Sequence, residues 1–207
     1  MKLFVFIVLR ISYMPVFAYS LLPFNNVSWS KKGVIMSFAD VTIGEKAPDE
    51  VRVVVEIPKG SHHKYEFDEK MQVIKLDRVL HSPVFYPTDY GFIPQTRSLD
   101  GDHLDALVII SEPVFPGCIV AVRPVGVLYM EDQNEKDEKI IAVAANDPLM
   151  TNKKDIEDIE DFFKKEIHHF FEVYKQLENK KVEVHHWHNR EVAHKIIKEA
   201  YERFTKE

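Results

Sequence analysis

Hydrophobic and polar residues alternate with a period of two through the middle of the chain. β-Branched residues dominate 51–57, and alternation continues over 64–67 and 73–79, with turn-forming residues between these stretches. A period of two is typical of a half-buried β-strand. Further strands are expected at 106–110, 119–130 and 139–145. Short strands separated by turns favour a small antiparallel β-barrel.

Two segments between these strands are expected to lie outside them. Residues 83–94 are rich in turn-forming residues and carry Tyr86 and Tyr90, so we expect a loop there. The acidic segment 131–138 is expected to be a hairpin that joins two strands. Turn-forming and charged residues give neither segment the composition of a strand.

The strand expected at 73–79 ends on a charge. Alternation places Ile74, Leu76 and Arg78 on one face, which is otherwise apolar. Such an arginine either reaches the rim of the face through its aliphatic stem or has a functional role there. The pattern alone leaves both interpretations open.

The hydrophobic period changes to three or four residues in the last third of the chain, which is typical of amphipathic helices. The first helical stripe consists of Ile159, Phe163, Ile167, Phe170, Tyr174 and Leu177, and it places Tyr174 on the buried side. A strand is expected at 181–187. A closing helix carries the second stripe, formed by Val192, Ile196, Ala200 and Phe204.

Composition narrows the class of protein. The 207 residues suffice for one folded domain that buries about 70% of the surface of its unfolded chain. Cys118 is the single cysteine, so neither an intramolecular disulfide nor a cysteine-based zinc finger can form. A net charge of −6 argues against nucleic acid as a partner. An acidic protein that handles an anionic substrate must also supply its own cations.

The first 35 residues differ in character from the rest of the chain. An apolar run at 3–9 is followed by Arg10, which spoils a membrane span because a span requires ~20 mostly apolar residues. We expect residues 1–35 to be an upstream extension of the reading frame, with a weak signal segment as the alternative. The catalytic domain is then expected to cover residues 36–207.

Three carboxylates fall within six residues, at Asp100, Asp102 and Asp105, immediately before an apolar strand. At a separation of ~5–6 Å and an effective dielectric of ~20, each pair of like charges costs about 3 kcal/mol, so the three groups need protons or a cation. Carboxylate oxygens alone favour a hard ion such as Mg²⁺ or Mn²⁺. The simpler alternative is a solvated turn rich in aspartate.

The segment Asp100-Gly101-Asp102-His103-Leu104-Asp105 resembles the metal-binding signature of the soluble, family I inorganic pyrophosphatases. From about Val51 to the C-terminus, further segments match the pattern of that family in the same order. They are Val55–Pro58, Lys64–Glu66, Asp77–Arg78, Phe85–Pro87, Asp89–Gly91, Arg123–Gly126, Asp132, Asp137, Lys139, Phe170–Phe171 and Tyr174–Lys175. The sequence departs from the pattern at His103, where the family usually has proline, and this affects the rigidity of the loop.

The resemblance, which is to the compact bacterial form, implies an α+β fold that consists of a small five-stranded antiparallel, OB-like β-barrel with flanking helices. It implies hydrolysis of inorganic pyrophosphate to two phosphates, with several Mg²⁺ ions as cofactor and Mn²⁺ as a substitute. It also implies a cytoplasmic homohexamer with no membrane or nucleic-acid partner.

The resemblance further assigns roles to individual residues. The implied metal ligands are Glu66, Asp100, Asp105, Asp132 and Asp137. Asp102 is implied as the catalytic group that accepts a proton from water, with Glu56 and Tyr86 in the layer of residues around the metal ligands. The implied substrate ligands are Lys64, Arg78, Tyr90, Lys139, Tyr174 and Lys175.

Two alternatives of other classes stay open at this point. An OB-type barrel also serves noncatalytic modules that bind nucleic acid or phosphate, although the acidic composition argues against this. A metal-dependent phosphatase that acts on nucleotides or other organic phosphates would need an apolar or aromatic pocket for the base, and the sequence shows no pattern for one.

Overall fold

The computed structural model describes residues 37–206. The expectation for residues 1–35 lies outside the described residues, and so does the choice between an extension and a signal segment. Within the described part of the chain, no helix combines the length and the apolar character that crossing a membrane requires.

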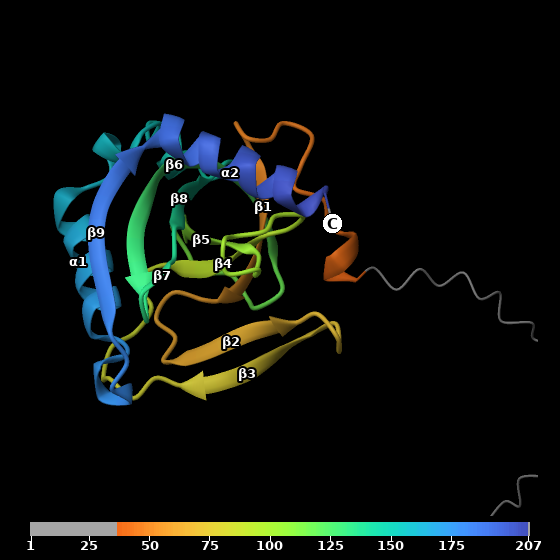
Figure 1. Cartoon of the computed structure of the whole chain (residues 1–207). Coiled ribbons are helices and arrows are strands. Elements are labelled where there is room, and N and C mark those ends of the chain that lie inside the picture. The colour runs from red at the N-terminus through yellow and green to blue at the C-terminus, as the bar shows by residue number, and fades with distance from the viewer. Residues whose placement is uncertain (1–36, 207) are drawn as a thin grey trace, which may run out of the picture. The chain divides into compact units, whose positions relative to one another are not determined.

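A ring of five strands forms the centre of the fold (Figure 1). In ring order the strands are β1 (Val51–Ile57), β4 (Asp89–Ile93), β5 (Leu104–Ile109), β8 (Lys139–Ala144) and β6 (Ile119–Asp132), which pairs again with β1. Four of these pairings are antiparallel, and the β5–β8 pairing is parallel. The predicted five-stranded ring is therefore confirmed, with one parallel pair in it.

Strand β4 corrects the sequence analysis, which assigned 83–94 to a loop. All five residues of β4 are buried, and the strand lies between β1 and β5. A short strand that is buried on both faces shows no alternation, and the flanking prolines give it the composition of a turn. Gly91 is required in β4 because a Cβ there would lie 2.0 Å from the carbonyl oxygen of Val54 on β1.

Two hydrophobic clusters pack on the two faces of the ring. One contains Ala106 and Val108 of β5 and the apolar side of helix α2 (Arg190–Phe204). The other contains Leu107 of β5 and the apolar side of helix α1 (Asp161–Val173). Figure 1 shows α2 crossing one end of the ring, while α1 and strand β9 (Val182–Asn189) lie along its outside.

The predicted strand at 181–187 and the closing helix are confirmed as β9 and α2, but the first helix is shorter than its stripe. Helix α1 ends at Val173, and Tyr174 caps it. Leu177 lies in η4 (Gln176–Glu178) and is 63% exposed, so its predicted burial is wrong. Once the helix has ended, helical spacing no longer keeps Leu177 on the buried side. The other 3-10 helices are η1 (Phe38–Asp40), η2 (Pro148–Met150) and η3 (Ile156–Asp158).

Strands β2 (His63–Asp68) and β3 (Val73–Val79) form a separate two-stranded sheet beside the ring (Figure 1). A bulge interrupts their register, because Lys64 lies opposite Arg78 while Tyr65 lies opposite Leu76. The extra residue, Asp77, turns Arg78 to the side of Lys64 and away from Leu76. The predicted common face of Leu76 and Arg78 is therefore wrong.

Candidate active site

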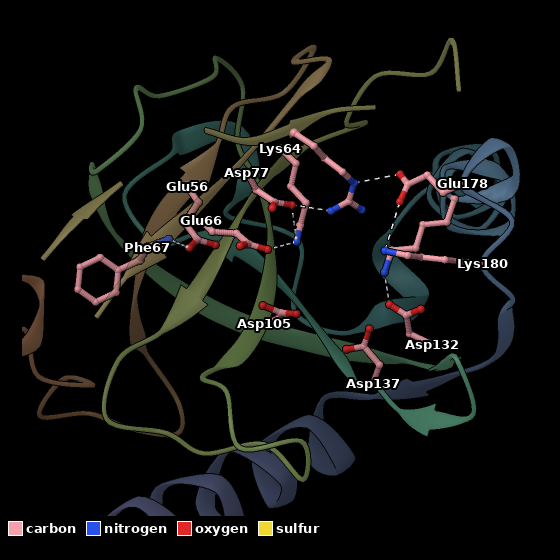
Figure 2. Close-up of polar contacts among 12 residues, drawn as sticks. Glu56, Lys64, Glu66, Phe67, Asp77, Asp105, Asp132, Asp137, Glu178 and Lys180 are labelled. Carbon is pink, nitrogen blue, oxygen red and sulfur yellow. Dashed lines mark hydrogen bonds and ion pairs between the residues drawn. The ribbon is translucent and has the colours of Figure 1, made fainter. Parts of the chain in front are cut away.

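A cavity of about 240 Å³ lies between the β2–β3 hairpin and the ring. Most of its polar lining is acidic and consists of Glu56, Glu66, Glu69, Asp100, Asp102 and Asp105, together with Lys64, Tyr90 and His103. Figure 2 shows the carboxylates of Glu56, Glu66 and Asp105 gathered in one region. The fold thus brings together acids from β1, β2, β5 and the loop before β5.

The loop 98–103 sets the positions of Asp100 and Asp102. The backbone N–H of Asp102 donates to Asp100 Oδ1 at 3.0 Å, and the N–H of Ser98 donates to the Asp102 carbonyl at 2.7 Å. Gly101 lies between the two acids with a φ of +93°, a conformation that strains residues with a side chain. This tight turn holds two carboxylates side by side at the cavity.

Two of the carboxyl groups hold a proton more tightly than usual. Burial raises the pKa of Asp102, and the charges of Asp100 and Asp105 raise it further. Burial raises the pKa of Glu56 from 4.5 to about 8, although Glu56 Oε1 accepts a hydrogen bond from the N–H of Phe67 at 2.7 Å. Among residues 37–206, no ion pair joins Glu56, Asp100 or Asp102 to a cationic side chain. The negative charge of Asp100 and Asp102 is therefore not balanced by a cationic side chain of the described residues.

Lys139 balances the charge at another part of the site. This residue of β8 is only 3% exposed, and its Nζ donates to Asp105 Oδ2 and Asp137 Oδ1, both at 2.5 Å. Burial would lower the pKa of Lys139, but the two carboxylates outweigh burial and raise this pKa well above its ordinary value. Burial raises the pKa of Asp137, and Lys139 opposes that shift. The ammonium group thus stands between two carboxylates.

Asp132 lies at the end of β6, where the predicted hairpin at 131–138 is confirmed by pairing with β7 (Glu135–Lys136). Asp132 Oδ2 forms an ion pair with Lys175 Nζ. Burial lowers the pKa of Lys175, and this ion pair opposes the shift. In the described residues, Asp132 Oδ1 is buried and has no hydrogen-bond partner. An unpartnered, buried carboxylate oxygen is costly, and a cation would satisfy it.

The β2–β3 hairpin contributes two further cations. Lys64 Nζ forms an ion pair with Glu66 and lies 3.7 Å from Asp77 Oδ2. Arg78 donates from Nη1 to Asp77 Oδ2 at 2.5 Å and from Nε to Glu178 Oε1 at 2.9 Å. Arg78 Nη2 is buried without a partner in the described residues. The guanidinium group therefore retains an unused donor.

Sequence reasoning assigned no role to Asp77 or Glu178. Glu178 lies 100 residues from Arg78 in the chain, and no local pattern marks it. Burial would raise the pKa of Glu178, but Arg78 outweighs burial and lowers it. Asp77 belongs to the segment Asp77–Arg78, which matches the family pattern, and this match could have identified it as a site residue. Both acids hold the Arg78 side chain in place.

Three buried tyrosines complete the region. Burial raises the pKa of Tyr86, Tyr90 and Tyr174, so their hydroxyl groups stay protonated and able to donate. Tyr174 is 5% exposed, as its position in the helical stripe predicts. Lys139 Nζ lies 5.6 Å from the centre of the Tyr90 ring, and charges of Arg78 and Lys139 act on Tyr86. The predicted site residues therefore lie in one continuous region.

The donor atoms in this region fit a hard divalent cation. The available ligand atoms are carboxylate oxygens, with no cysteine sulfur among them, and Asp132 Oδ1 has no hydrogen-bond partner in the described residues. Within residues 37–206, the group with three ligand atoms all within 4.8 Å of one another lies elsewhere, at Glu131, Glu183 and His185. In the candidate active site itself, Lys139 lies between the carboxylates of Asp105 and Asp137, and Lys175 pairs with Asp132.

Comparison with known proteins agrees with this geometry. The family model described as inorganic pyrophosphatase matches residues 53–205. The inorganic pyrophosphatase of Methanosarcina mazei is 51% identical over 75% of this chain and 92% of its own length, and that of Geobacillus stearothermophilus is 46% identical over 76% and 95%. The crystal structure of inorganic pyrophosphatase from Thermus thermophilus superposes with a TM-score of 0.80 at 44% identity, covering 82% of this chain and 99% of that one. This chain belongs to the inorganic pyrophosphatase family.

Proposed function

We propose that this protein hydrolyses inorganic pyrophosphate to two phosphates with several bound Mg²⁺ ions, for which Mn²⁺ can substitute. The supporting observation is that carboxylates without a cationic partner lie in the same region as Arg78, whose Nη2 has no hydrogen-bond partner in the described residues. The acids suit metal ions, and Arg78 Nη2 suits an anionic oxygen. Pyrophosphate with bound metal ions would supply cations to the carboxylates and anionic oxygens to the arginine.

The proposed metal ligands are the carboxylates that border the cavity or follow β6. They are Glu66, Asp100, Asp105, Asp132 and Asp137, and Glu56 orients water around them. When bound, divalent ions neutralise phosphate oxygens and make water more acidic. Side chains of the protein accept the proton and bind the substrate.

Asp102 is the proposed acceptor of the proton that the attacking water releases. A base needs a lone pair that neither a cation nor a hydrogen-bond donor occupies, and no cationic side chain in the described residues pairs with Asp102. Its raised pKa makes Asp102 a stronger base than an ordinary aspartate. The carboxylates of Asp105 and Asp137, which Lys139 already engages, are less suited to this role.

Of the proposed substrate ligands, Lys64 and Tyr90 line the cavity, and Lys139 donates to Asp105 at the cavity. The others lie on strand β3 and directly after helix α1. Arg78 offers its unused Nη2, and the buried tyrosines offer neutral hydroxyl donors. Lys64, Lys139 and Lys175 neutralise the substrate as the anion takes the place of their present carboxylate partners. The proposed set is Lys64, Arg78, Tyr90, Lys139, Tyr174 and Lys175.

Phosphate release separates this proposal from its alternatives. We expect phosphate from pyrophosphate in the presence of Mg²⁺, little from ATP, and none with either substrate in excess chelator. Equal release from ATP would indicate a phosphatase for organic phosphates. Binding of a single-stranded oligonucleotide without any phosphate release would indicate a noncatalytic OB-type module.

The proposal also includes a homohexamer that works in the cytoplasm, and a catalytic domain that comprises residues 36–207. Membership of the family supports the proposed assembly and compartment only as what the family resemblance implies. The extent of the structural match supports the domain boundary, because it covers 82% of this chain and 99% of the Thermus thermophilus chain. Sedimentation velocity measures the assembly directly, and a mass near that of one chain would contradict it. A protein that starts at Met36 should retain full turnover; loss of turnover would contradict the domain boundary.

A further inference from the structure

A second cavity, of about 360 Å³, lies apart from the candidate active site and has no role in the proposed chemistry. Four parts of the chain form it: the turn before β1, the middle of β6, the segment between η2 and η3, and the start of α2. Figure 1 shows α2 and the β2–β3 hairpin, which borders the candidate active site, on opposite sides of the ring. The two cavities share no lining residue.

This second cavity, the basic cavity, has a positive lining although the whole chain carries a net charge of −6. Five basic side chains line it against two acidic ones. A concave surface with one sign of charge concentrates ions of the opposite sign, so this lining attracts anions. The basic residues are Lys46, Arg123, Lys153, Lys154 and Arg190, and the acidic ones are Asp49 and Glu50.

The two acids of the basic cavity engage their partners weakly. Lys46 Nζ lies 3.4 Å from Glu50 Oε1, and Arg190 Nη2 lies 3.5 Å from Asp49 Oδ1. The side chains of Lys46 and Asp49 are each 72% exposed. Ion pairs that are this long and this exposed contribute little, so an anion in the cavity can compete with them.

Two other basic residues keep donors that the chain does not use. Arg123 Nη2 donates to the Met150 carbonyl at 2.7 Å, whereas Arg123 Nε is buried without a hydrogen-bond partner in the described residues. Within residues 37–206, no carboxylate forms an ion pair with Lys154 Nζ, while Lys153 pairs with Glu160. An acceptor beside Arg123 would remove the cost of its buried, unused donor.

We propose that the basic cavity binds the phosphate group of a small molecule, at a site separate from the candidate active site. Arginine presents its donors in a planar fork that fits two oxygens of one phosphate group. A phosphate ester carries about −1.5 to −2 charges at pH 7, which suits a lining with several cations in excess. The segment Arg123–Gly126, which matches the family pattern without a role in the proposed chemistry, would supply the central ligand. This inference does not rest on the proposed function.

Hydrogen exchange of the metal-free, full-length protein, titrated with inorganic phosphate, reports on each cavity separately. At the basic cavity, the Glu50 amide donates to the Lys46 carbonyl at 3.2 Å and the Lys154 amide donates to Asp158 Oδ2 at 2.8 Å. At the candidate active site, the reporter is the Asp102 amide. Phosphate should slow exchange of the Glu50 and Lys154 amides, and the titration gives the dissociation constant of this site.

Two substitutions should weaken this binding. Lys154→Gln should raise the dissociation constant roughly fivefold, because an exposed charge is lost, and kcat for pyrophosphate should stay within about twofold of the wild type. Arg123→Lys should raise the dissociation constant at least about tenfold, because lysine lacks the planar fork. Lys165→Gln, at an exposed lysine of helix α1 that forms no ion pair in the described part of the chain, is the matched control. It should bind phosphate as the wild type does.

Glycerol phosphate in place of inorganic phosphate distinguishes the two sources of the group. Tighter binding of the ester indicates a phosphorylated metabolite, and tighter binding of inorganic phosphate indicates the free ion; both support the site. Absence of protection below about 10 mM of either compound, or equal affinity in the wild type, Lys154→Gln and Arg123→Lys, would overturn it.

The binding test stays decisive in two further cases. If the wild type does not hydrolyse pyrophosphate, the proposed function fails while the exchange result still decides the basic cavity. If Arg123→Lys does not fold, the double variant of Lys46→Gln and Lys154→Gln, at two exposed side chains, replaces it under the same criteria.

Discussion

The loop 98–103 and the region around Lys139 bring comparable numbers of carboxylates together, yet they treat the resulting charge in opposite ways. At the loop, Asp100 and Asp102 have no ion pair with a cationic side chain of the described residues, and the pKa of Asp102 is raised. Around Lys139, an ammonium group lies 2.5 Å from both Asp105 and Asp137. One region needs a cation from outside, and the other already contains one.

This difference suggests a division of labour between the two regions. Unbalanced acids attract divalent ions and leave one carboxylate free to accept a proton. Asp105 and Asp137 keep the buried ammonium group of Lys139 charged, so that under the proposed function this group can bind a phosphate oxygen. The same residue type, aspartate, serves two purposes because its neighbours differ.

Loss of the free base is expected to have the largest effect. Asp102→Asn should lower kcat for pyrophosphate by about 10²- to 10⁴-fold, because the amide cannot accept the proton from water. The melting temperature should stay close to that of the wild type, since no ion pair is lost. Asp161→Asn, at a side chain that is 90% exposed on helix α1, is the control. Unchanged turnover in Asp102→Asn would rule out the assignment of Asp102 as the base.

Loss of the internal cation should act on stability as well as on turnover. Lys139→Met removes the partner of two carboxylates, of which Asp137 is largely buried, and should lower the free energy of unfolding by about 3–5 kcal/mol in chelator. Urea unfolding measures this change. Lys195→Met, whose side chain is 75% exposed, should change the same quantity by less than about 0.5 kcal/mol. Equal values for the two variants would mean that Lys139 does not balance these acids.

The raised pKa of Glu56 predicts that the free energy of unfolding of the metal-free protein depends on pH. Because its pKa is about 8 in the folded protein and 4.5 ordinarily, the folded state keeps a proton that the unfolded chain releases between these values. The free energy of unfolding should therefore fall as pH rises from 4.5 to 8. Glu56→Gln should remove roughly 2–4 kcal/mol of this decrease, measured by calorimetry in chelator at pH 5 and pH 8. Parallel curves for the two proteins would contradict the raised pKa.

Removal of one metal ion should have a smaller effect on stability than Lys139→Met. Mg²⁺ at about 100 times its dissociation constant should raise the free energy of unfolding by about 2.7 kcal/mol per site, because the ion binds the folded state alone. Asp100→Asn should reduce the increase, whereas Asp161→Asn should leave it unchanged. An identical increase in Asp100→Asn would exclude Asp100 as a ligand.

The sequence predicts the parts of this molecule whose pattern is local. The β-branched residues at 51–57 and the helical stripe of α2 each identify an element correctly, because these residues pack in the core. Likewise, the close spacing of Asp100, Asp102 and Asp105, together with the other segments that match the family pattern, predicts the acidic end of the site. Each of these signals lies within a few residues.

What the sequence does not predict depends on distant contacts. Strand β4 shows no alternation because both of its faces are buried, and its proximity to β1 is evident only in three dimensions. Glu178 becomes the partner of Arg78 through a fold that brings together residues 100 positions apart. Leu177 is exposed because α1 ends four residues earlier than its apolar spacing suggests.

The bulge in β3 shows that strand length, as well as residue identity, decides what this site contains. With Asp77 present, two residues of β3 stand opposite one of β2, and the guanidinium group of Arg78 turns toward the cavity side of the hairpin. A strand shorter by that one residue would keep the arginine and direct it to the solvent face with Leu76. Insertions and deletions in this hairpin are therefore as informative about activity in related sequences as substitutions at the charged positions.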